Sequence, residues 1–305
     1  MRHRAPRYRG VGERPRARAW CIGTVLTVLA AVIATAAAAP AGADFPITLT
    51  RGSRLLVQAS INGRAVQALL DSAAEVTLID ARFASDLGLH GGQRVAGQGS
   101  GQAGFDAELI KGVTLGVFGV TLRDQEIAVA DLGDVGTRLL GQRLDVILGR
   151  EIFDAARLQI DIAGGRVRVM PRNSAPAGVR LELVSERGIE TLPVTIEEHG
   201  PLRATFDLGN GSQVLIGATL AQRLHLLTDG RAVTQQRGGG LGGEGVRQVI
   251  QLRSLEVAGR TFTRVPAAID AQPSAADVNL GISVLRHFLI TTDFAAHQLW
   301  LEPRP

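Results

Sequence analysis

Two aspartates in this chain of 305 residues stand where a paired catalytic site would be encoded. Each ends an apolar run and is followed by small residues: Asp71 precedes Ser72-Ala73-Ala74, and Asp207 precedes Leu208-Gly209. A buried strand that stops on a carboxylate and then turns tightly gives this pattern. Two carboxylates held together cannot both ionise, so they share a proton and offer a general base beside a general acid. We therefore predict that Asp71 and Asp207 form one catalytic pair.

The surroundings of the two aspartates repeat in order along the chain, which indicates an internal duplication. Each half has a hairpin, an apolar strand ending on aspartate, a short helix, a glycine-rich stretch, further hairpins and an apolar run into glycine. In the first half the later elements are 81–89, 97–101 and 146–149, and in the second half they are 218–227, 238–243 and 278–281. The repeat predicts that the two halves fold alike and face each other.

Short runs of Val, Ile and Leu separated by turn residues predict a mostly β fold. Hairpin turns are expected at 61–64, 117–121 and 257–261, and helices only at 81–89 and 218–227. The predicted organisation is an N-terminal segment 1–43, a lobe 44–172, a linker 173–180 and a second lobe 181–305.

Charge and composition exclude several functions. Residues 1–20 hold seven arginines and one glutamate, a net charge of +6, and residues 21–43 carry no charge. Because the whole chain has a net charge of +4, the part from Asp44 onward carries +4 − 6 = −2. No basic surface remains to predict nucleic-acid binding. The single cysteine is Cys21, and the histidines are scattered, so we expect no thiol nucleophile, no metal and no other cofactor.

The N-terminal segment is typical of an export signal. An arginine-rich start leads into the uncharged apolar run 21–39 and then into small residues before Asp44. The alanine-rich end of the run favours cleavage near Ala43, and the alternative is an uncleaved membrane anchor. Either way, we expect the folded part to be periplasmic or extracellular.

These motifs resemble the aspartic proteases, on the retropepsin-like side. That family has an apolar pair, then Asp-Thr/Ser-Gly, and later an apolar-apolar-Gly strand and helix, which Val146-Ile147-Leu148-Gly149 matches. The resemblance covers nearly all of 45–303, once per half. It implies an all-β fold in which two retropepsin-like barrels, each with a short helix, are fused in one chain, so we expect a monomer with an internal pseudo-two-fold. It also implies an endopeptidase that hydrolyses peptide or protein substrates by water activated between Asp71 and Asp207.

Each acid loop departs from the family pattern at one position. The residue after the acid is expected to be Thr or Ser, whose hydroxyl clamps the opposite loop; Ser72 can do this and Leu208 cannot. The next residue is expected to be glycine, which Gly209 satisfies, while Ala73 fits only with a negative φ. The clamp is therefore expected to be half complete.

The glycine-rich stretches are expected to be flap tips that close over substrate, with Gly99 and Ser100 in one and Gly240 and Gly242 in the other. Two-lobed pepsin-like enzymes use one flap and retropepsin dimers use two, so two flaps favour a fused retropepsin dimer.

Other acids have simpler interpretations, as strand-end or turn residues: Asp131, which shares the Asp-Leu-Gly letters of the second motif, Asp161 and Asp293. Glu75 is expected to face solvent or the mouth of the cleft. The glycosylation-like Asn210-Gly211-Ser212 is interpreted as accidental because it falls inside the acid loop. Because of Ala73 and Leu208, a catalytically impaired peptide-binding module on the same fold remains the alternative; an assembly surface has no feature in its favour.

Overall fold

The hairpin turns predicted from the sequence are present, and their backbone angles explain why each has glycine at its second position. The computed structural model describes residues 42–272 and 276–304. In it, Asn62-Gly63, Phe118-Gly119 and Ala258-Gly259 each have two successive positive φ angles. Such turns match the natural twist of the two strands they join, and glycine adopts the second position without strain. The three hairpins predicted from the sequence are confirmed.

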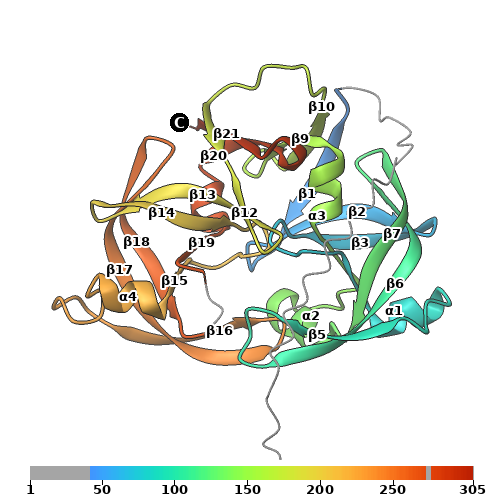
Figure 1. Cartoon of the computed structure of the whole chain (residues 1–305), viewed down its shortest axis with the longest axis horizontal. Helices are drawn as coiled ribbons and strands as arrows, with labels where there is room; N and C mark the ends of the chain where they lie inside the picture. Colours follow the sequence, from blue (N-terminus) through green and yellow to red (C-terminus); the bar gives the residue numbers. More distant parts are fainter. Residues whose placement is uncertain (1–41, 273–275, 305) are drawn as a thin grey trace, which may run out of the picture. The chain divides into compact units, whose positions relative to one another are not determined.

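The first half of the chain forms a closed barrel, which we call the N-terminal lobe. Its strands follow the order β2-β3-β8-β4-β7-β6, and an additional pairing of β2 with β6 closes the ring (Figure 1). The elements of this lobe are β1 (Asp44–Leu49), β2 (Leu55–Ile61), β3 (Arg64–Leu70), β4 (Leu78–Asp80), α1 (Ala81–Asp86), β5 (Gln93–Gln98), β6 (Gly104–Val117), β7 (Val120–Ala130), α2 (Gly133–Leu140), β8 (Val146–Leu148), α3 (Arg150–Ala155), β9 (Arg157–Asp161) and β10 (Arg166–Met170).

The second half repeats this arrangement as the C-terminal lobe. Its strands follow the order β13-β14-β19-β15-β18-β17, and β13 also pairs with β17. Its elements are β11 (Val179–Glu182), β12 (Val184–Glu186), β13 (Ile189–Ile196), β14 (His199–Phe206), β15 (Val214–Gly217), α4 (Ala218–Arg223), β16 (Thr234–Gly240), β17 (Gly243–Val257), β18 (Arg260–Asp270), β19 (Val278–Leu280), α5 (Ile282–Leu285), β20 (Phe288–Asp293), the 3-10 helix η1 (Phe294–Ala296) and β21 (Gln298–Pro303). Two all-β lobes of like topology confirm the predicted fold class.

The sequence prediction of only two helices is wrong. The helices predicted at 81–89 and 218–227 form as α1 and α4, but α2, α3 and α5 are present as well. These three are short and begin at or just after a glycine. Helices of four to eight residues are too brief to show a helical period, and tertiary packing rather than local propensity stabilises them.

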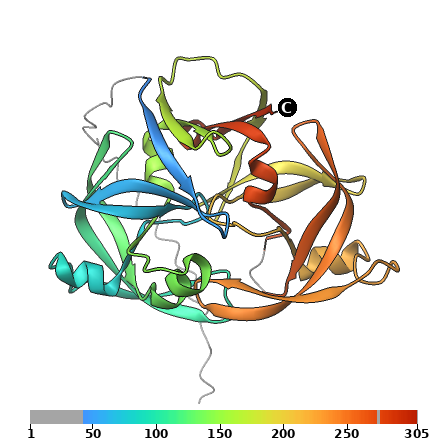
Figure 2. The ribbon, with the colours of Figure 1, turned by 180° about the vertical axis from the view of Figure 1, so that it is seen from behind.

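A sheet of terminal strands joins the lobes. β11, β21, β20, β9, β10 and β1 lie side by side in that order, so three strands of the C-terminal lobe continue into three strands of the N-terminal lobe in one sheet. Figure 2 shows the red β20 and β21 beside the yellow-green β9 and β10 at the top of the view. One continuous apolar core runs through both lobes, and Phe153 of α3 stacks on Phe294 of η1 with ring centroids 5.0 Å apart. This joint fixes the two acid loops relative to each other.

Buried ion pairs lie at the ends of these joining strands. Arg157 at the start of β9 binds Asp293 at the end of β20 (2.9 Å), and its guanidinium stacks over Trp300 at 4.9 Å. Asp293 also accepts from Arg172, and Asp161 binds Arg166 and Arg304. Asp161 and Asp293 are thus strand-end acids, as the sequence predicts, with a structural role at the junction.

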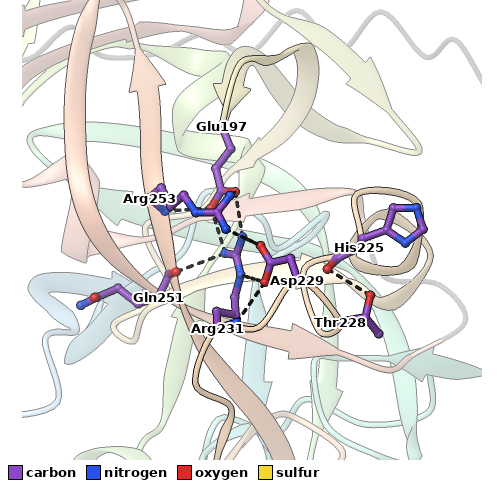
Figure 3. Close-up of polar contacts among 7 residues, drawn as sticks. All are labelled: Glu197, His225, Thr228, Asp229, Arg231, Gln251 and Arg253. Atoms are coloured by element: carbon purple, nitrogen blue, oxygen red, sulfur yellow. Dashed lines mark hydrogen bonds and ion pairs between the residues drawn. The ribbon is translucent and has the colours of Figure 1, made fainter.

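A separate charged cluster secures the long connection between α4 and β16 (Figure 3). Arg231 donates to both oxygens of Glu197, at 2.8 Å each, and also binds Asp229, which binds Arg253. Glu197 sits in the β13–β14 turn with a φ of 49°. The cluster ties three segments of the C-terminal lobe together, and the N-terminal lobe has a plain Asn-Gly turn at the matching place.

Within the two stretches that the structure describes, no helix has the length and apolarity needed to cross a membrane. The apolar run 21–39 lies outside those residues.

The Arg157–Asp293 pair generates a stability prediction. The two side chains are only 7% and 2% exposed, so Arg157→Met leaves a buried carboxylate with one cation fewer. Breaking a buried pair from one side typically costs about 3 kcal/mol or more. We expect a loss of that size in the free energy of unfolding measured with urea.

Arg180→Met is the matched control, because Arg180 pairs with Glu182 on the surface, where the side chains are 54% and 83% exposed. It should change the free energy of unfolding by less than about 1 kcal/mol. Equal effects of the two substitutions would contradict a special role for the buried pair.

Candidate active site

The two predicted catalytic acids occupy equivalent places in the two lobes. Asp71 follows β3 and Asp207 follows β14, and each of these strands runs parallel to the short strand that precedes a glycine, β8 and β19. The Asp71 amide donates to Leu148 O and the Asp207 amide to Leu280 O, both at 3.0 Å. The apolar-apolar-Gly elements therefore hold both acid loops by the same backbone hydrogen bond.

Ser72 joins the two acid loops directly. Its hydroxyl donates to Phe206 O at 2.7 Å and accepts from the Leu208 amide at 2.9 Å. Ser72 is buried, so both bonds form away from water and are stronger for it. Leu208 is buried as well but has no hydroxyl to return the bond. The side-chain hydrogen bonds of this connection thus come from the N-terminal loop, through Ser72, with none from Leu208 in return.

Backbone amides and one side chain stabilise the carboxylates. Asp71 accepts from the amide of Ala73 at 2.9 Å, with Ala73 at a negative φ, and from the amide of Ala74. Asp207 accepts from the amides of Gly209 and Asn210, the latter at 2.9 Å. The Asn279 side-chain amide adds a bond of 2.6 Å to the other Asp207 oxygen. Asp207 is therefore the better stabilised anion of the two.

Gly209 brings the loops into contact. A Cβ at this position would overlap the Asp71 carboxyl group, so only glycine lets the second loop approach so closely. The other predicted loop residues, Ser72 and Ala73, lie on the facing loop. The structure thus brings Asp71, Asp207, Ser72, Ala73 and Gly209 together at one place between the lobes.

Burial raises the pKa of both acids, and charge repulsion adds to the effect at Asp71. Burial, followed by the negative charge of Asp207, raises the pKa of Asp71 to about 7. Burial also raises the pKa of Asp207, against the lowering effect of its hydrogen bond from Asn279. The two groups titrate as a pair, and such perturbation is typical of catalytic carboxylates. The arrangement favours a pair that holds one proton between its two carboxyl groups.

Arg54 is a buried cation close to the pair that the sequence did not single out. It precedes β2 and donates to Gly52 O at 2.6 Å, while its Nε is buried with no hydrogen-bond partner among the residues described here. Its positive charge lowers the pKa of both Asp71 and Asp207. Burial lowers the pKa of Arg54 itself. Arg54 thus partly offsets the repulsion between the two carboxylates.

The lobes support their acid loops by different side chains. In the N-terminal lobe, Thr77 donates through its hydroxyl to Glu151 of α3 at 2.9 Å and accepts from the Gly149 amide at 3.0 Å. In the C-terminal lobe, the Asn210 amide group donates to Asn279 at 2.8 Å and to Gln213 O at 3.2 Å. Both hydrogens of Asn210 are used inside the loop, which agrees with the interpretation of its glycosylation motif as accidental.

The glycine-rich stretches form two hairpin tips that meet, as Figure 1 shows for β5–β6 and β16–β17. The amides of Gly101 and Ala103 donate to the carbonyls of Leu241 and Gly242, both at 2.9 Å. The predicted tip residues Gly99, Ser100, Gly240 and Gly242 all lie at this contact, which leaves no room for a Cβ at the three glycines. We call these two hairpins the first and second flap.

Other residues weighed from the sequence lie elsewhere. Asp131 accepts from the Gly133 amide at 2.8 Å in a turn, and Glu75 is exposed. A groove of about 840 Å³ between α1, β5 and β6 is lined by residues that include His90 and Asp131 but neither candidate catalytic acid. Asn279, Arg54 and Thr77 were missed by sequence reasoning. Only Asn279 had a signal, as a polar residue in the apolar run before Gly281.

Comparison with known proteins identifies a family. A family model described as aspartyl protease matches the chain twice, at residues 57–152 and 192–284. The two matched segments fall in the two lobes and include the two acid loops. No curated protein matches the chain.

The raised pKa of Asp71 predicts how stability depends on pH. Its ordinary value is 3.8 and its folded value about 7, so between about pH 4 and pH 7 the folded chain keeps a proton that the unfolded chain has lost. The stabilisation from this proton is complete below pH 4 and is lost as the pH rises to 7. The free energy of unfolding of the unaltered chain should therefore decrease as the pH rises from 4 to 7. In Asp71→Asn we expect this decrease to be less steep, with a slope smaller by up to about 1.4 kcal/mol per pH unit.

Urea unfolding at a series of pH values from 4 to 7 measures this slope. Asp131→Asn is the control, since it removes an exposed turn carboxylate and should leave the slope as it is in the unaltered chain. A slope unchanged by Asp71→Asn would show that Asp71 does not hold the proton.

Proposed function

Because the chain belongs to the aspartyl protease family, we propose that it is an endopeptidase in which Asp71 and Asp207 activate a water molecule between them. The observation that carries the proposal is the direct contact of the two acid loops. Ser72 is hydrogen-bonded to Phe206 and Leu208 of the facing loop, and Gly209 packs on the Asp71 carboxyl group. Two strand-end acids from separate lobes have no structural need to meet in this way.

The hydrogen bonds suggest how the two acids divide the work. Asp207 accepts from the Asn279 side chain as well as from backbone, which favours its ionised form. Asp71 holds the shared proton. In the proposed reaction Asp207 takes a proton from the water as it attacks the peptide carbonyl carbon, and Asp71 donates its proton to the carbonyl oxygen. The resulting tetrahedral intermediate then collapses with proton transfer to the leaving nitrogen.

The proposed chemistry needs a singly protonated pair, so the rate should fall as the pH rises above about 7, where Asp71 loses its proton. The test is cleavage of a mixed peptide library by the purified chain from pH 3 to pH 8. We expect cleavage that Asp71→Asn abolishes and that the control Asp131→Asn leaves intact. Cleavage that survives in Asp71→Asn would refute the proposal.

Ser72→Ala belongs in the same experiment. It removes both bonds of Ser72 to the facing loop and leaves the acids in place. Small displacements of catalytic groups cost large factors in rate, so we expect kcat to drop about tenfold or more while the folded content seen by circular dichroism stays unchanged. An unchanged kcat would show that the pair does not depend on this bridge.

One observation favours a second candidate, a catalytically impaired peptide-binding module. Leu208 offers no hydroxyl to the N-terminal loop, so that loop lacks the bond that Ser72 gives the other. Binding of extended peptides by the unaltered chain without turnover of any of them, over the same pH range, would support this candidate over the peptidase.

We also propose that the chain is exported and acts outside the cytoplasm as a monomer whose two lobes supply one acid each. The arginine-rich start, the apolar run 21–39 and the small residues before Asp44 support export. Expression of the full chain in a bacterial host tests it: the product is expected in the periplasm or medium, starting near Asp44. A product that stays in the cytoplasm with its first residues intact would contradict export, and one that stays in the membrane would indicate the anchor.

A further inference from the structure

Between the acid loops and the two flap tips, the faces of the two lobes differ in chemistry, and we call these faces the two walls of the cleft. On the N-terminal lobe, a second apolar cluster lies apart from the core of the barrel, beside the Asp71 loop. Ala74 of that loop and Leu241 of the second flap tip both pack against it, so it spans the space from the acids to the flap. Its buried members are Leu56, Leu69, Leu78, Ala107, Ala128, Ala130, Leu132, Val135, Leu144 and Ile147.

Strand register identifies the matching residues of the C-terminal lobe. Leu69 is paired with Ile147, and Thr205 is paired in the same way with Asn279, two residues before each catalytic acid. Following the strand pairings around each barrel gives the residues that occupy equivalent positions in the two lobes. At four positions an apolar residue of the N-terminal lobe corresponds to a polar one of the C-terminal lobe: Leu56 to Thr191, Ala130 to Asp270, Ala107 to Arg247 and Val95 to Gln236. Leu78 and Ala128 match Leu215 and Ala268, which stay apolar.

The polar replacements contact one another in pairs. Where the N-terminal lobe has Ala107 and Ala130, the C-terminal lobe has Arg247 and Asp270, which approach to 3.6 Å and are only 13% and 12% exposed. Because these polar residues interact with each other across neighbouring strands, they form a continuous polar face and are not isolated changes on the surface. We call this face the polar wall.

A second pair lies further along the same face. Val76, one residue before Thr77, packs on the apolar cluster together with Val95. Gln213, one residue before Val214, holds the corresponding place in the other lobe, and its amide donates to Gln236 at 2.9 Å. Two valines that pack on the apolar cluster of one lobe are therefore matched by two hydrogen-bonded glutamines in the other.

The first flap tip marks the polar wall as part of the same cleft. Arg247 donates to Ser100 O at 2.7 Å, and Gln102 lies against Gly245. The first flap thus reaches the polar wall of the C-terminal lobe, and the second flap, through Leu241, reaches the apolar wall of the N-terminal lobe.

We propose that the cleft selects peptides with an aliphatic residue on one side of the scissile bond and a neutral hydrogen-bonding residue (Asn, Gln, Ser or Thr) on the other. The inference rests on the proposed function. Successive side chains of an extended peptide point to opposite sides, so the two residues at the scissile bond face different walls. The N-terminal wall is formed by the apolar cluster. The C-terminal wall offers a donor in Arg247 and acceptors in Asp270 and Gln236, which a neutral side chain satisfies without adding charge to the ion pair.

Four peptides that differ only at the two residues flanking the scissile bond test this: Leu–Gln, Gln–Leu, Leu–Leu and Gln–Gln. With the full chain, we expect one of the two mixed peptides to exceed Leu–Leu and Gln–Gln in kcat/KM by about tenfold or more, the scale set by an unsatisfied or missing pocket contact. A chain that prefers Leu–Leu, or that does not distinguish the four, overturns the inference.

Two double variants convert the polar wall to the residues of the apolar wall. Arg247→Ala with Asp270→Ala copies Ala107 and Ala130, and Gln213→Val with Gln236→Val copies Val76 and Val95. Each is expected to raise kcat/KM for Leu–Leu relative to the mixed peptide by about tenfold. An unchanged ratio in both overturns the inference. If the Arg247→Ala, Asp270→Ala variant does not fold, the Gln213→Val, Gln236→Val variant tests the inference alone, because Gln236 is exposed and tolerant of change.

Arg237→Ala with Glu244→Ala is the matched control. It removes an ion pair of 2.9 Å from the same flap, with Arg237 79% exposed, and should leave the ratio unchanged.

The same four sequences with a reduced, uncleavable central bond separate this inference from the proposed function. If no peptide is cleaved but the reduced peptides bind in the predicted order, the inference stands and the peptidase proposal fails. If none is cleaved and none binds, both fail.

Discussion

The contact between the two acid loops is the interaction on which the site depends, because it brings two half-buried carboxylates close to each other. Burial opposes the ionisation of both, and the charge of Asp207 further opposes that of Asp71, so the pKa of Asp71 rises to about 7 and that of Asp207 rises as well. Such a pair persists only when the surrounding structure makes its separation more costly than its repulsion. Each acid loop is therefore attached to its own barrel through an identical backbone bond, and the barrels are joined through a shared sheet and a continuous apolar core. Ser72 and Gly209 then set the contact between the loops.

The two lobes share topology but have divided the supporting roles between them. The N-terminal loop supplies the hydroxyl that bridges the lobes, and the C-terminal loop supplies the glycine that admits the facing carboxyl group. The N-terminal lobe secures its loop through Thr77 and Glu151, whereas the C-terminal lobe uses Asn210 and Asn279. Since Asn279 also binds Asp207, the two carboxylates have unequal surroundings. In the proposed mechanism this inequality assigns Asp71 as the acid and Asp207 as the base, and the lobes also differ in the apolar and polar residues between the acid loops and the flaps.

Several local features could be predicted from the sequence because they have local causes. Asn62-Gly63 and Ala258-Gly259 encode tight hairpins by themselves, since two positive φ angles are needed in successive residues. The acid loops, the apolar-apolar-Gly runs and the glycine-rich flap tips could be found because each occurs twice in the same order. The helices α2, α3 and α5 could not, because segments of this length show no period and form only where the tertiary structure packs them.

The sequence by itself determined the duplication, the all-β lobes, the two candidate acids and the half-complete clamp around them, because strand periodicity and turn chemistry act over a few residues. Only the tertiary structure decided which groups surround those acids. Arg54 lies near the pair, and Asn279 bonds to Asp207 from 72 residues further along the chain. Arg54 has no signal in its neighbours, and the polar residue Asn279 in its apolar run does not show which group it bonds. The contrast between an apolar and a polar wall also required the strand register, because the side chains that share a face come from strands that neighbour one another in the sheet but are separated along the chain.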